Sequence, residues 1–365
     1  MSQVNTNSIY DASGGSAAKL YGVSMRNGGT AWVNRIINGG MVIDQRNNGA
    51  SVTPTNSQYL VDRFYAGLTQ ASKFTAQQNA GAVTPPAGFK NYLGVTSSSA
   101  YSVLTGDTFY VGQVIEGYNI ADLGWGAAGA QTVTLSFWVR SSLTGTFGGT
   151  ITNASARSYL FSYTISAANT WEQKTVTIAG DTSGTWGSTN AAGIIVWFGL
   201  GSGSTFSGTA GVWSSSVLVQ PTGSTSVVGT NGATWYITGV QLEAGTVASP
   251  FERIDYGRQL IMCQRYLPVV KAGSAMSGYA ISATTAYGSA PFGVIARVAP
   301  TGLTTTISGA LWNASGSSLG LTSLGFSSAG TAGAFVLPGT SSGLTGGAGT
   351  IFLNNSDILF TGCEL

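Results

Sequence analysis

The chain of 365 residues has 15 Lys or Arg and 13 Asp or Glu residues, so it is only 8% charged and has a net charge of +2. A charge this low and this evenly spread argues against nucleic-acid binding. The 53 glycines and the 11% of aromatic residues exclude a disordered chain and favour an all-β protein of two or three domains.

So few charges leave a protein surface poorly protected against association. We therefore expect either that identical subunits bury much of this surface or that it faces neutral ligands such as glycans. The N-terminal stretch MSQVNTNSIYDASGG has no apolar signal-peptide core, and no apolar run is long enough to span a membrane. We expect a protein made and kept in a cytoplasm, without membrane insertion.

The chain divides into four segments by composition. Residues 1–33 are polar and rich in Gly, Ser and Asn, which is typical of an arm that docks on a partner or stays flexible. Strand patterns then begin with a short apolar strand at residues 41–43, before a turn at Asn48-Gly49. We predict an arm (1–33), a β-sandwich (34–254), a linking helix (255–268) and a smaller C-terminal β domain (269–365).

Alternation of apolar and polar side chains marks the strands of the sandwich. Residues 194–198 are apolar on both faces, which indicates a central strand. Gly239 predicts either a bulge in the strand at residues 234–244 or a close approach by a neighbouring strand. The side chains that we expect to face inward are Val133, Leu135, Phe137, Val139, Tyr236, Val240 and Leu242.

A change of period after residue 251 predicts one short helix. Asp255 is a candidate N-cap and Pro268 a candidate end. The apolar stripe of this helix consists of Tyr256, Leu260, Cys263 and Leu267. Cys263 and Cys363 have no metal-ligand spacing, so two unpaired thiols or a bridge between them both remain open.

Several segments between residues 34 and 268 resemble one protein family, and they occur in family order. They are NRIINGGMVIDQRNNGASVT, YLVDRFYAG, VIEGYNIADLGWGAAGAQTVTLSFWVRSSLTGTFGG, NTWEQKTVTIAGDTSGTW, TWYITGVQLEAGTVASPFER and CQRYL. This part of the chain resembles the jelly-roll, carbohydrate-binding-module-like β-sandwich of tail fibres and other virion appendages of tailed phages. The arm (1–33) and the C-terminal segment (269–365) fall outside the resemblance.

The resemblance implies a virion protein, assembled in the host bacterial cytoplasm as a homotrimer and attached to other virion proteins by its N-terminal arm. We expect a non-enzymatic structural protein that mediates attachment to a host-surface glycan. Two alternatives remain. One is a polysaccharide depolymerase tailspike, and the other is a purely structural capsid or tail fibre without receptor binding.

Catalytic chemistry has few candidate residues. The absence of histidine removes Ser-His-Asp and Cys-His catalysis and most zinc sites. Glycan cleavage needs two carboxylates facing one cleft, for which Glu116 and Asp122 are the best pair, although a structural role explains both equally well. The other acids considered are Asp107, Glu172, Asp181, Glu243 and Glu252.

We expect no catalytic residue, no cofactor and no metal. The alternative for a metal is a structural calcium site at Asp181 and Glu243, but calcium needs more oxygen ligands than these acids supply. Arg253, Arg258 and Arg265 could bind an anion. The simpler interpretation is that they bind backbone carbonyls or pair with Glu252 and Asp255, which are close to them in the sequence.

Sugar recognition commonly uses aromatic faces, and four candidates lie in turns or loops. Trp125 and Trp186 are flanked by glycine, and Tyr101 and Phe206 are also in predicted loops. For the two tryptophans the sequence favours the simpler interpretation that they plug the end of the sandwich. The tryptophans on or beside strands, which we expect in the core, are Trp138, Trp171, Trp197 and Trp235.

Overall fold

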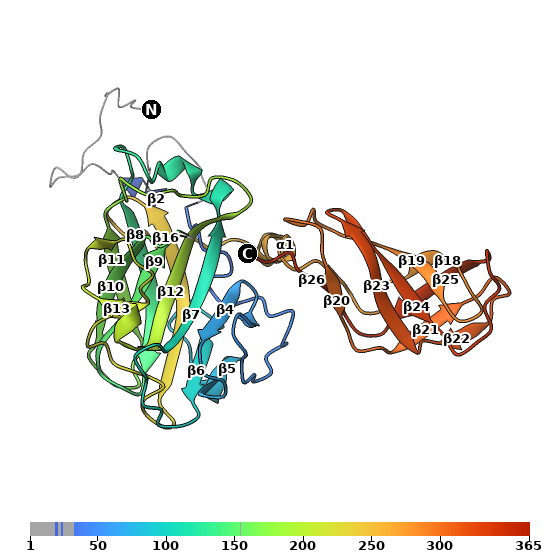
Figure 1. Cartoon of the computed structure of the whole chain (residues 1–365), viewed down its shortest axis with the longest axis horizontal. Coiled ribbons are helices and arrows are strands. Elements are labelled where there is room, and N and C mark those ends of the chain that lie inside the picture. The colour runs from blue at the N-terminus through green and yellow to red at the C-terminus, as the bar shows by residue number, and fades with distance from the viewer. Residues whose placement is uncertain (1–18, 21–22, 25–32, 154) are drawn as a thin grey trace.

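The computed structural model describes residues 19–20, 23–24, 33–153 and 155–365 (Figure 1). The arm predicted for residues 1–33 lies outside these residues, except for β1 (Lys19–Leu20), β2 (Val23–Ser24) and residue 33. Figure 1 shows two β-rich bodies with the single α-helix between them. The predicted fold class is therefore confirmed: the protein is all-β, with a β-sandwich and one short helix.

Two antiparallel sheets form the first body, and the chain passes repeatedly from one to the other, as in a jelly roll. The seven-stranded sheet, called here the sandwich sheet, contains in spatial order β14 (Trp213–Ser214), β10 (Ser158–Ile165), β9 (Gly145–Thr152), β12 (Ala192–Ser202), β7 (Thr108–Glu116), β4 (Phe64–Leu68) and β3 (Tyr59–Val61). The five-stranded sheet contains β11 (Glu172–Ile178), β8 (Val133–Ser141), β16 (Thr234–Ala244), β6 (Leu93–Ser97) and β5 (Phe74–Gln78).

The core between these sheets follows the period-two pattern of the sequence. Val133, Leu135, Phe137 and Val139 all face inward as predicted, and β12 is a central strand between β9 and β7. A register shift in β16 between Thr238 and Gln241 confirms the bulge predicted at Gly239.

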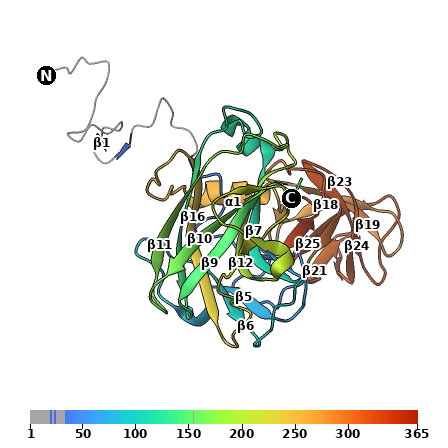
Figure 2. The same ribbon diagram turned by 60° about the vertical axis from the view of Figure 1, so that its left-hand side comes forward.

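Short elements connect or cover the sandwich strands. They are η1 (Ala80–Ala82), η2 (Gly117–Asn119), η3 (Ala121–Leu123), η4 (Ser204–Phe206), β13 (Ser207–Gly208) and β15 (Gln220–Pro221). The last of these crosses the outer face of the sandwich sheet, where Pro221 contacts Gly148. Figure 2 shows β9, β10, β12 and β7 side by side in this sheet.

Two expectations for this body are wrong. Residues 41–43 form no strand, because Asn38 and Met41 have positive φ angles of 60° and 56° and the chain turns there. The Asn38 side chain holds the turn by binding Ile43 O and Asp62 O. Tyr236 is buried, but the strand bulge leaves it on the opposite face, against Tyr92 rather than in the main core.

The helix α1 (Tyr256–Gln264) begins where the sequence predicts, because the Asp255 side chain accepts a hydrogen bond from Arg258 N. It ends earlier than the predicted limit at Pro268. Of the predicted apolar stripe, Cys263 and Leu267 are buried, whereas Tyr256 is exposed. In the part of the chain that is described, α1 is the only α-helix, and no helix there is long and apolar enough to cross a membrane.

Two further sheets form the second body and enclose a second core. The three-stranded sheet contains β17 (Val269–Val270), β26 (Ile358–Thr361) and β20 (Gly302–Thr304). The seven-stranded sheet, called here the C-terminal sheet, contains β22 (Ser318–Gly320), β21 (Gly309–Trp312), β25 (Gly349–Asn354), β18 (Met276–Ala280), β19 (Ala286–Pro291), β24 (Gly333–Gly339) and β23 (Ser323–Gly330).

A buried charged joint connects the two bodies. Arg63, in the turn between β3 and β4, is only 1% exposed and pairs with Glu364 near the end of the chain. Arg46 also pairs with Glu364, and the Arg63 guanidinium lies 3.5 Å from the ring centroid of Tyr266 after α1. Cys263 and Cys363 are both buried near this joint as free thiols.

Candidate functional site

The outer face of the sandwich sheet has a row of four large aromatic side chains from neighbouring strands. Trp197, Tyr110, Tyr65 and Tyr59 project from β12, β7, β4 and β3, on the side opposite the core. The backbone register sets them in line, because Trp197 pairs with Gly112, Gly112 with Tyr65, and Tyr65 with Tyr59. We call these four side chains the aromatic row.

Glycines on the neighbouring strands leave room for two of these rings close to the backbone of the sheet. A Cβ atom added at Gly67 would overlap the ring of Tyr110, and one added at Gly112 would overlap the indole of Trp197. Each ring therefore covers the backbone of the adjacent strand.

Contacts within the aromatic row hold the rings in place. The Trp197 indole N–H donates to the Tyr65 hydroxyl at 2.7 Å. The rings of Tyr110 and Trp197 stack with centroids 4.4 Å apart, and those of Tyr65 and Tyr110 meet edge to face at 6.2 Å. Burial raises the pKa of Tyr65 well above its ordinary value, so its hydroxyl stays protonated across the physiological range.

The two ends of the aromatic row have different neighbours. At one end, Gln220 of β15 packs over Gly199, the residue opposite Tyr110. At the other end, the Arg46 guanidinium lies 4.6 Å from the ring centroid of Tyr59. The Tyr59 hydroxyl donates to Leu365 O at 3.3 Å, which connects this end to the joint.

The two tryptophans considered for sugar binding are buried, in agreement with the interpretation that they plug the end of the sandwich. Trp125 is 8% exposed and Trp186 is 9% exposed, and their rings meet edge to face at 4.7 Å. Trp213 packs against both of them. Glycine neighbours suggested open turns, but the three rings fill one end of the sandwich, so no broad face of either tryptophan is presented to solvent.

The other two predicted sugar-binding residues are half-buried. Tyr101 packs against the sandwich core, and its hydroxyl donates to Asp107 at 2.7 Å. Phe206 ends η4. The structure does not bring Tyr101, Phe206 and the two tryptophans together into one surface with the aromatic row, and their role in sugar binding stays a prediction.

The carboxylates considered for catalysis have structural partners. Glu116 accepts two hydrogen bonds from Arg265, at 2.6 and 3.0 Å, and one from Tyr266 at 2.6 Å. Burial by itself raises the pKa of Glu116, but these hydrogen bonds outweigh it and leave the pKa below its usual range. Asp122 pairs with Arg35.

The remaining acids are also held locally. Asp181 forms a bidentate pair with Arg157, and Glu243 binds the backbone and hydroxyl of Ser249. Asp107 binds Thr69, Glu172 pairs with Lys174, and Glu252 binds the backbone of residues 33 and 34. Across the described residues, no group of three or more acidic or cysteine side chains could hold a metal ion.

The three arginines near the helix make separate contacts. Arg253 lies over the rings of Phe89 and Phe251, and Arg265 binds Glu116. Arg258 supplies the backbone N–H that Asp255 caps. The structure therefore does not gather these three side chains into an anion site.

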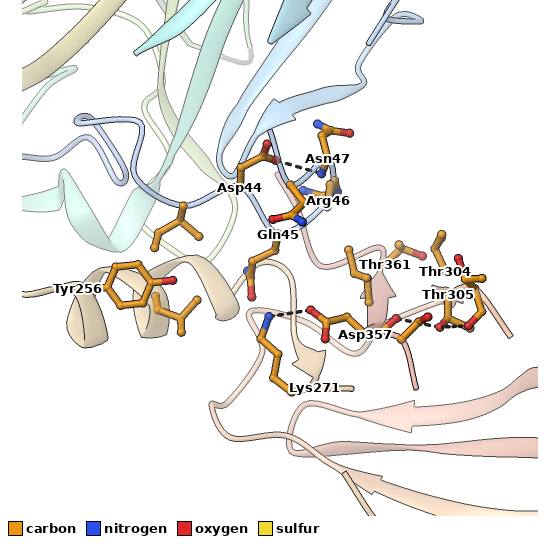
Figure 3. Close-up of a pocket in the computed structure, with 16 residues that line it drawn as sticks. Asp44, Gln45, Arg46, Asn47, Tyr256, Lys271, Thr304, Thr305, Asp357 and Thr361 are labelled. Atoms are coloured by element: carbon orange, nitrogen blue, oxygen red, sulfur yellow. Dashed lines mark hydrogen bonds and ion pairs between the residues drawn. The ribbon is translucent and has the colours of Figure 1, made fainter. Parts of the chain in front are cut away.

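A polar cleft of about 830 Å³ lies between the two bodies (Figure 3). The turn at residues 44–48 forms one wall, and Lys271, residues 304–306 and Asp357 form the other, with Tyr256 of α1 at the edge. A cleft of this size at a domain junction is a usual place for a ligand.

The polar side chains of this cleft are already used to hold its walls. Asp44 accepts hydrogen bonds from Asn47 N and Gly49 N within its own turn. Lys271 pairs with Asp357 at 2.7 Å, and Arg46 pairs with Glu364 across the joint. We conclude that the cleft serves as a structural joint, and we take the aromatic row as the better candidate site.

Sequence reasoning placed Trp197 in the core, and the structure corrects this. Trp235 is buried in the core as expected, whereas Trp197 is half-buried on the outer face of the sandwich sheet. The signal was present in the sequence: Ile194, Val196 and Phe198 share the inward phase of β12, so Trp197 has to face outward.

Comparison with known proteins identifies no family. No family model and no curated protein matches the chain. Solved structures with some similarity include the enzymatically active domain of tailspike protein 4 of bacteriophage CBA120, at 12% identity and a TM-score of 0.32 over 58% of this chain. The match spans only 22% of that tailspike chain.

Two other similar structures are isolated modules. The family 11 carbohydrate-binding module of a Clostridium thermocellum cellulase is 11% identical over 54% of this chain and 100% of that module, with a TM-score of 0.27. The N-terminal cellulose-binding domain of Cellulomonas fimi β-1,4-glucanase C is 16% identical over 48% of this chain and 90% of that domain, also with a TM-score of 0.27. Similarities this weak say nothing about ligand or activity.

Proposed function

We propose that this protein binds a neutral glycan chain along the aromatic row of its sandwich sheet. The observation that carries the proposal is the line of four half-buried aromatic side chains on the outer face of the sandwich sheet, in which Tyr110 and Trp197 stack on each other beside Gly67 and Gly112. A line of aromatic side chains on a sheet offers apolar surface to the C–H groups of a pyranose ring. The Tyr65 and Tyr59 hydroxyls and the Arg46 guanidinium lie along the same line, where Trp197, Leu365 O and Glu364 hold them in place.

The proposed glycan is neutral because the charges next to the aromatic row are already compensated. Arg46 and Arg63 both pair with Glu364. An acidic sugar would have to compete with Glu364 for these guanidinium groups, and a neutral sugar would not. The low overall charge of the chain agrees with a ligand that needs no charged partner.

The wider setting that we propose is a virion appendage of a tailed phage, attached to a host-surface glycan. The resemblance of the segments between residues 34 and 268 supports this setting. In a homotrimer, three copies of a weak site would bind a surface polysaccharide much more tightly than one copy.

We propose binding without cleavage. Glu116 supports this, because a general acid for glycan cleavage needs a raised pKa and Glu116 has a lowered one. Reducing-end release from a bound polysaccharide, measured with the wild-type protein, would instead support the alternative of a depolymerase tailspike.

Affinity electrophoresis with soluble glucans, galactans and mannans tests the site. We expect at least one of these neutral polysaccharides to retard the protein, and polygalacturonate, an anionic control, to leave it unretarded. Trp197→Ala should weaken binding by about 30-fold, which corresponds to about 2 kcal/mol for a residue that dominates an interface. Tyr110→Leu keeps apolar bulk over Gly67 but removes the aromatic face, and it should also weaken binding.

Two control variants make the result specific. Tyr118→Ala removes a tyrosine that is 62% exposed and outside the aromatic row, and it should bind like the wild type. Tyr256→Ala removes the ring at the edge of the cleft. Loss of binding in Tyr256→Ala with full binding in Trp197→Ala would move the site to the cleft, and absence of retardation by every neutral polysaccharide would contradict glycan binding.

A further inference from the structure

The second body has a large apolar surface that no described part of the chain covers. Five adjacent strands of the C-terminal sheet, β21, β25, β18, β19 and β24, each direct one large apolar side chain away from the core. These five side chains are Trp312, Ile351, Tyr279, Tyr287 and Phe335. We call them the C-terminal stripe.

The C-terminal stripe crosses five adjacent strands and is partly exposed. The rings of Tyr279 and Tyr287 lie 5.8 Å apart, and those of Tyr287 and Phe335 stack at 4.9 Å. Ile351 pairs with Trp312 on the neighbouring strand. Three of the five are about half exposed: Ile351 at 52%, Tyr279 at 50% and Phe335 at 43%.

In this sheet the small side chains face the core and the large apolar ones face outward, which is the reverse of the usual arrangement. The inward positions of β18, β19 and β24 are mostly small, since Ala280, Ala286, Ala290 and Ala334 are buried in the core. The outward positions of the same strands contain the tyrosines and Phe335. A sheet whose larger apolar side chains face outward gains more from covering its outer face than an ordinary surface sheet does.

All four charged residues from residue 271 onward lie away from this sheet face. Lys271 pairs with Asp357, and Glu364 pairs with Arg46 and Arg63. Arg297 donates to Asn190 O and to Cys363 O. Glu364 and Arg297 contact the first body, Lys271 and Asp357 pair with each other, and the strands of the C-terminal sheet contain no charged residue.

The composition of the face selects among possible occupants. A glycan site requires directed polar groups, usually amides or charged side chains. The other outward positions of these strands are instead Ser277, Ser289, Pro291, Ala310, Gly333, Leu337, Gly349 and Leu353. A membrane surface requires basic residues beside the apolar ones. An interface between protein subunits fits better, because its core is rich in aromatic residues and poor in charges.

We propose that the C-terminal stripe is the surface through which copies of this chain associate. This inference rests on the homotrimer in the proposed function and assigns a surface to it. Two uncharged faces meet without like-charge repulsion. In a trimer the face would point toward the three-fold axis, so that each copy contacts both of its neighbours through it.

The size of the face agrees with such an interface. Seven strands spaced about 4.8 Å apart, and about 20 Å long at about 3.3 Å per residue, give a sheet roughly 29 Å wide. That rectangle projects to roughly 600 Å², and protruding side chains add accessible area, so that over its two contacts together each copy buries an area of the order of the roughly 800 Å² per partner of a standard interface.

Light scattering of the full chain at micromolar concentration tests the proposal. The wild type should have the mass of three chains. The variant Tyr279→Ser/Phe335→Ser/Ile351→Thr should have the mass of one chain and unchanged retardation by the neutral polysaccharide per site. A second variant, Phe335→Glu, should reach the same state by placing like charges in the interface.

The matched control is Leu104→Ser/Val212→Ser, which removes two equally exposed apolar side chains from the sandwich and should keep the mass of the wild type. Circular dichroism checks that each variant is folded. Wild-type monomer, or a folded Phe335→Glu variant that keeps the wild-type mass, would overturn the proposal. A wild-type dimer that Phe335→Glu dissociates would keep the surface but contradict the homotrimer, and polysaccharide binding lost in the stripe variants would assign the face to glycan instead.

Discussion

At the scale of single residues, the surroundings of a tryptophan in the sequence did not reveal its exposure. Trp125 and Trp186 have glycine neighbours but are buried, and each indole N–H has an internal acceptor, Gln131 O for Trp125 and Ser183 O for Trp186. Trp197 lies in an apolar run but takes part in an outer surface. The exposure of each tryptophan is decided by its position in the tertiary structure, that is, by whether its side chain points into the sandwich or away from it.

Trp125→Ala tests this placement. Removing a tryptophan from a filled sandwich end leaves a cavity, so we expect the free energy of unfolding to fall by about 3–5 kcal/mol. Urea denaturation followed by circular dichroism measures the change. Tyr118→Ala, at an exposed position, should change it by less than about 0.5 kcal/mol. Equal stability of the two variants would mean that Trp125 does not fill the core.

At the scale of secondary-structure elements, the ends of β7 and α1 are joined by one carboxylate. Glu116 is the last residue of β7, and Arg265 and Tyr266 directly follow α1. The hydrogen bonds among them connect the sandwich sheet to the chain that enters the second body. A strand, a helix end and a tyrosine therefore depend on one ionised group.

Glu116→Gln should change how stability depends on pH. A carboxyl group with a lowered pKa in the folded state contributes stability above its ordinary pKa of 4.5, and this contribution is lost as the pH falls through the folded value. The stability difference between wild type and variant should be largest at pH 7, at the lower end of roughly 3–5 kcal/mol because Arg265 is partly exposed. It should shrink below pH 4. Urea denaturation at both pH values measures it, and a difference that stays constant with pH would contradict the ionised pair.

At the scale of the whole molecule, the two bodies are coupled by a buried arginine. Arg63 donates to Val114 O and pairs with Glu364, which belongs to the last residues of the second body. Burial by itself lowers the pKa of Arg63, but Glu364 raises it above its usual value. The guanidinium therefore stays charged and depends on a partner from the other body.

Glu364→Ala should loosen the joint. It leaves Arg63 as a buried charge without its partner, which costs roughly 3–5 kcal/mol. We expect faster hydrogen exchange at residues 42–47 and 358–363 and a larger radius of gyration in small-angle X-ray scattering. Lys271→Ala removes a pair that is largely exposed, should cost less than about 1 kcal/mol, and is the matched control. Identical exchange in both variants would show that Arg63 does not couple the bodies.

Local patterns predicted most of the fold. The inward faces of β8 and β12, the bulge at Gly239 and the N-cap at Asp255 all depend on residues within one element, and the structure confirms them. The turn at residues 41–43 was missed because Asn38 bonds Asp62, far along the chain. The aromatic row was missed because it needs the pairing of four strands, which no single segment contains.

The sequence by itself determined that this protein is all-β, since periods of two, abundant glycines and one capped helical stretch are local properties. It also determined the scarcity of charge, which favours neutral partners for this protein. Only the tertiary structure decided which face each aromatic side chain joins. Strand register aligned Trp197 with Tyr65 and placed Tyr279 beside Tyr287, and it left Trp125 and Trp186 inside. The physical reason is that a side chain's neighbours on a sheet come from other strands, often a hundred residues away.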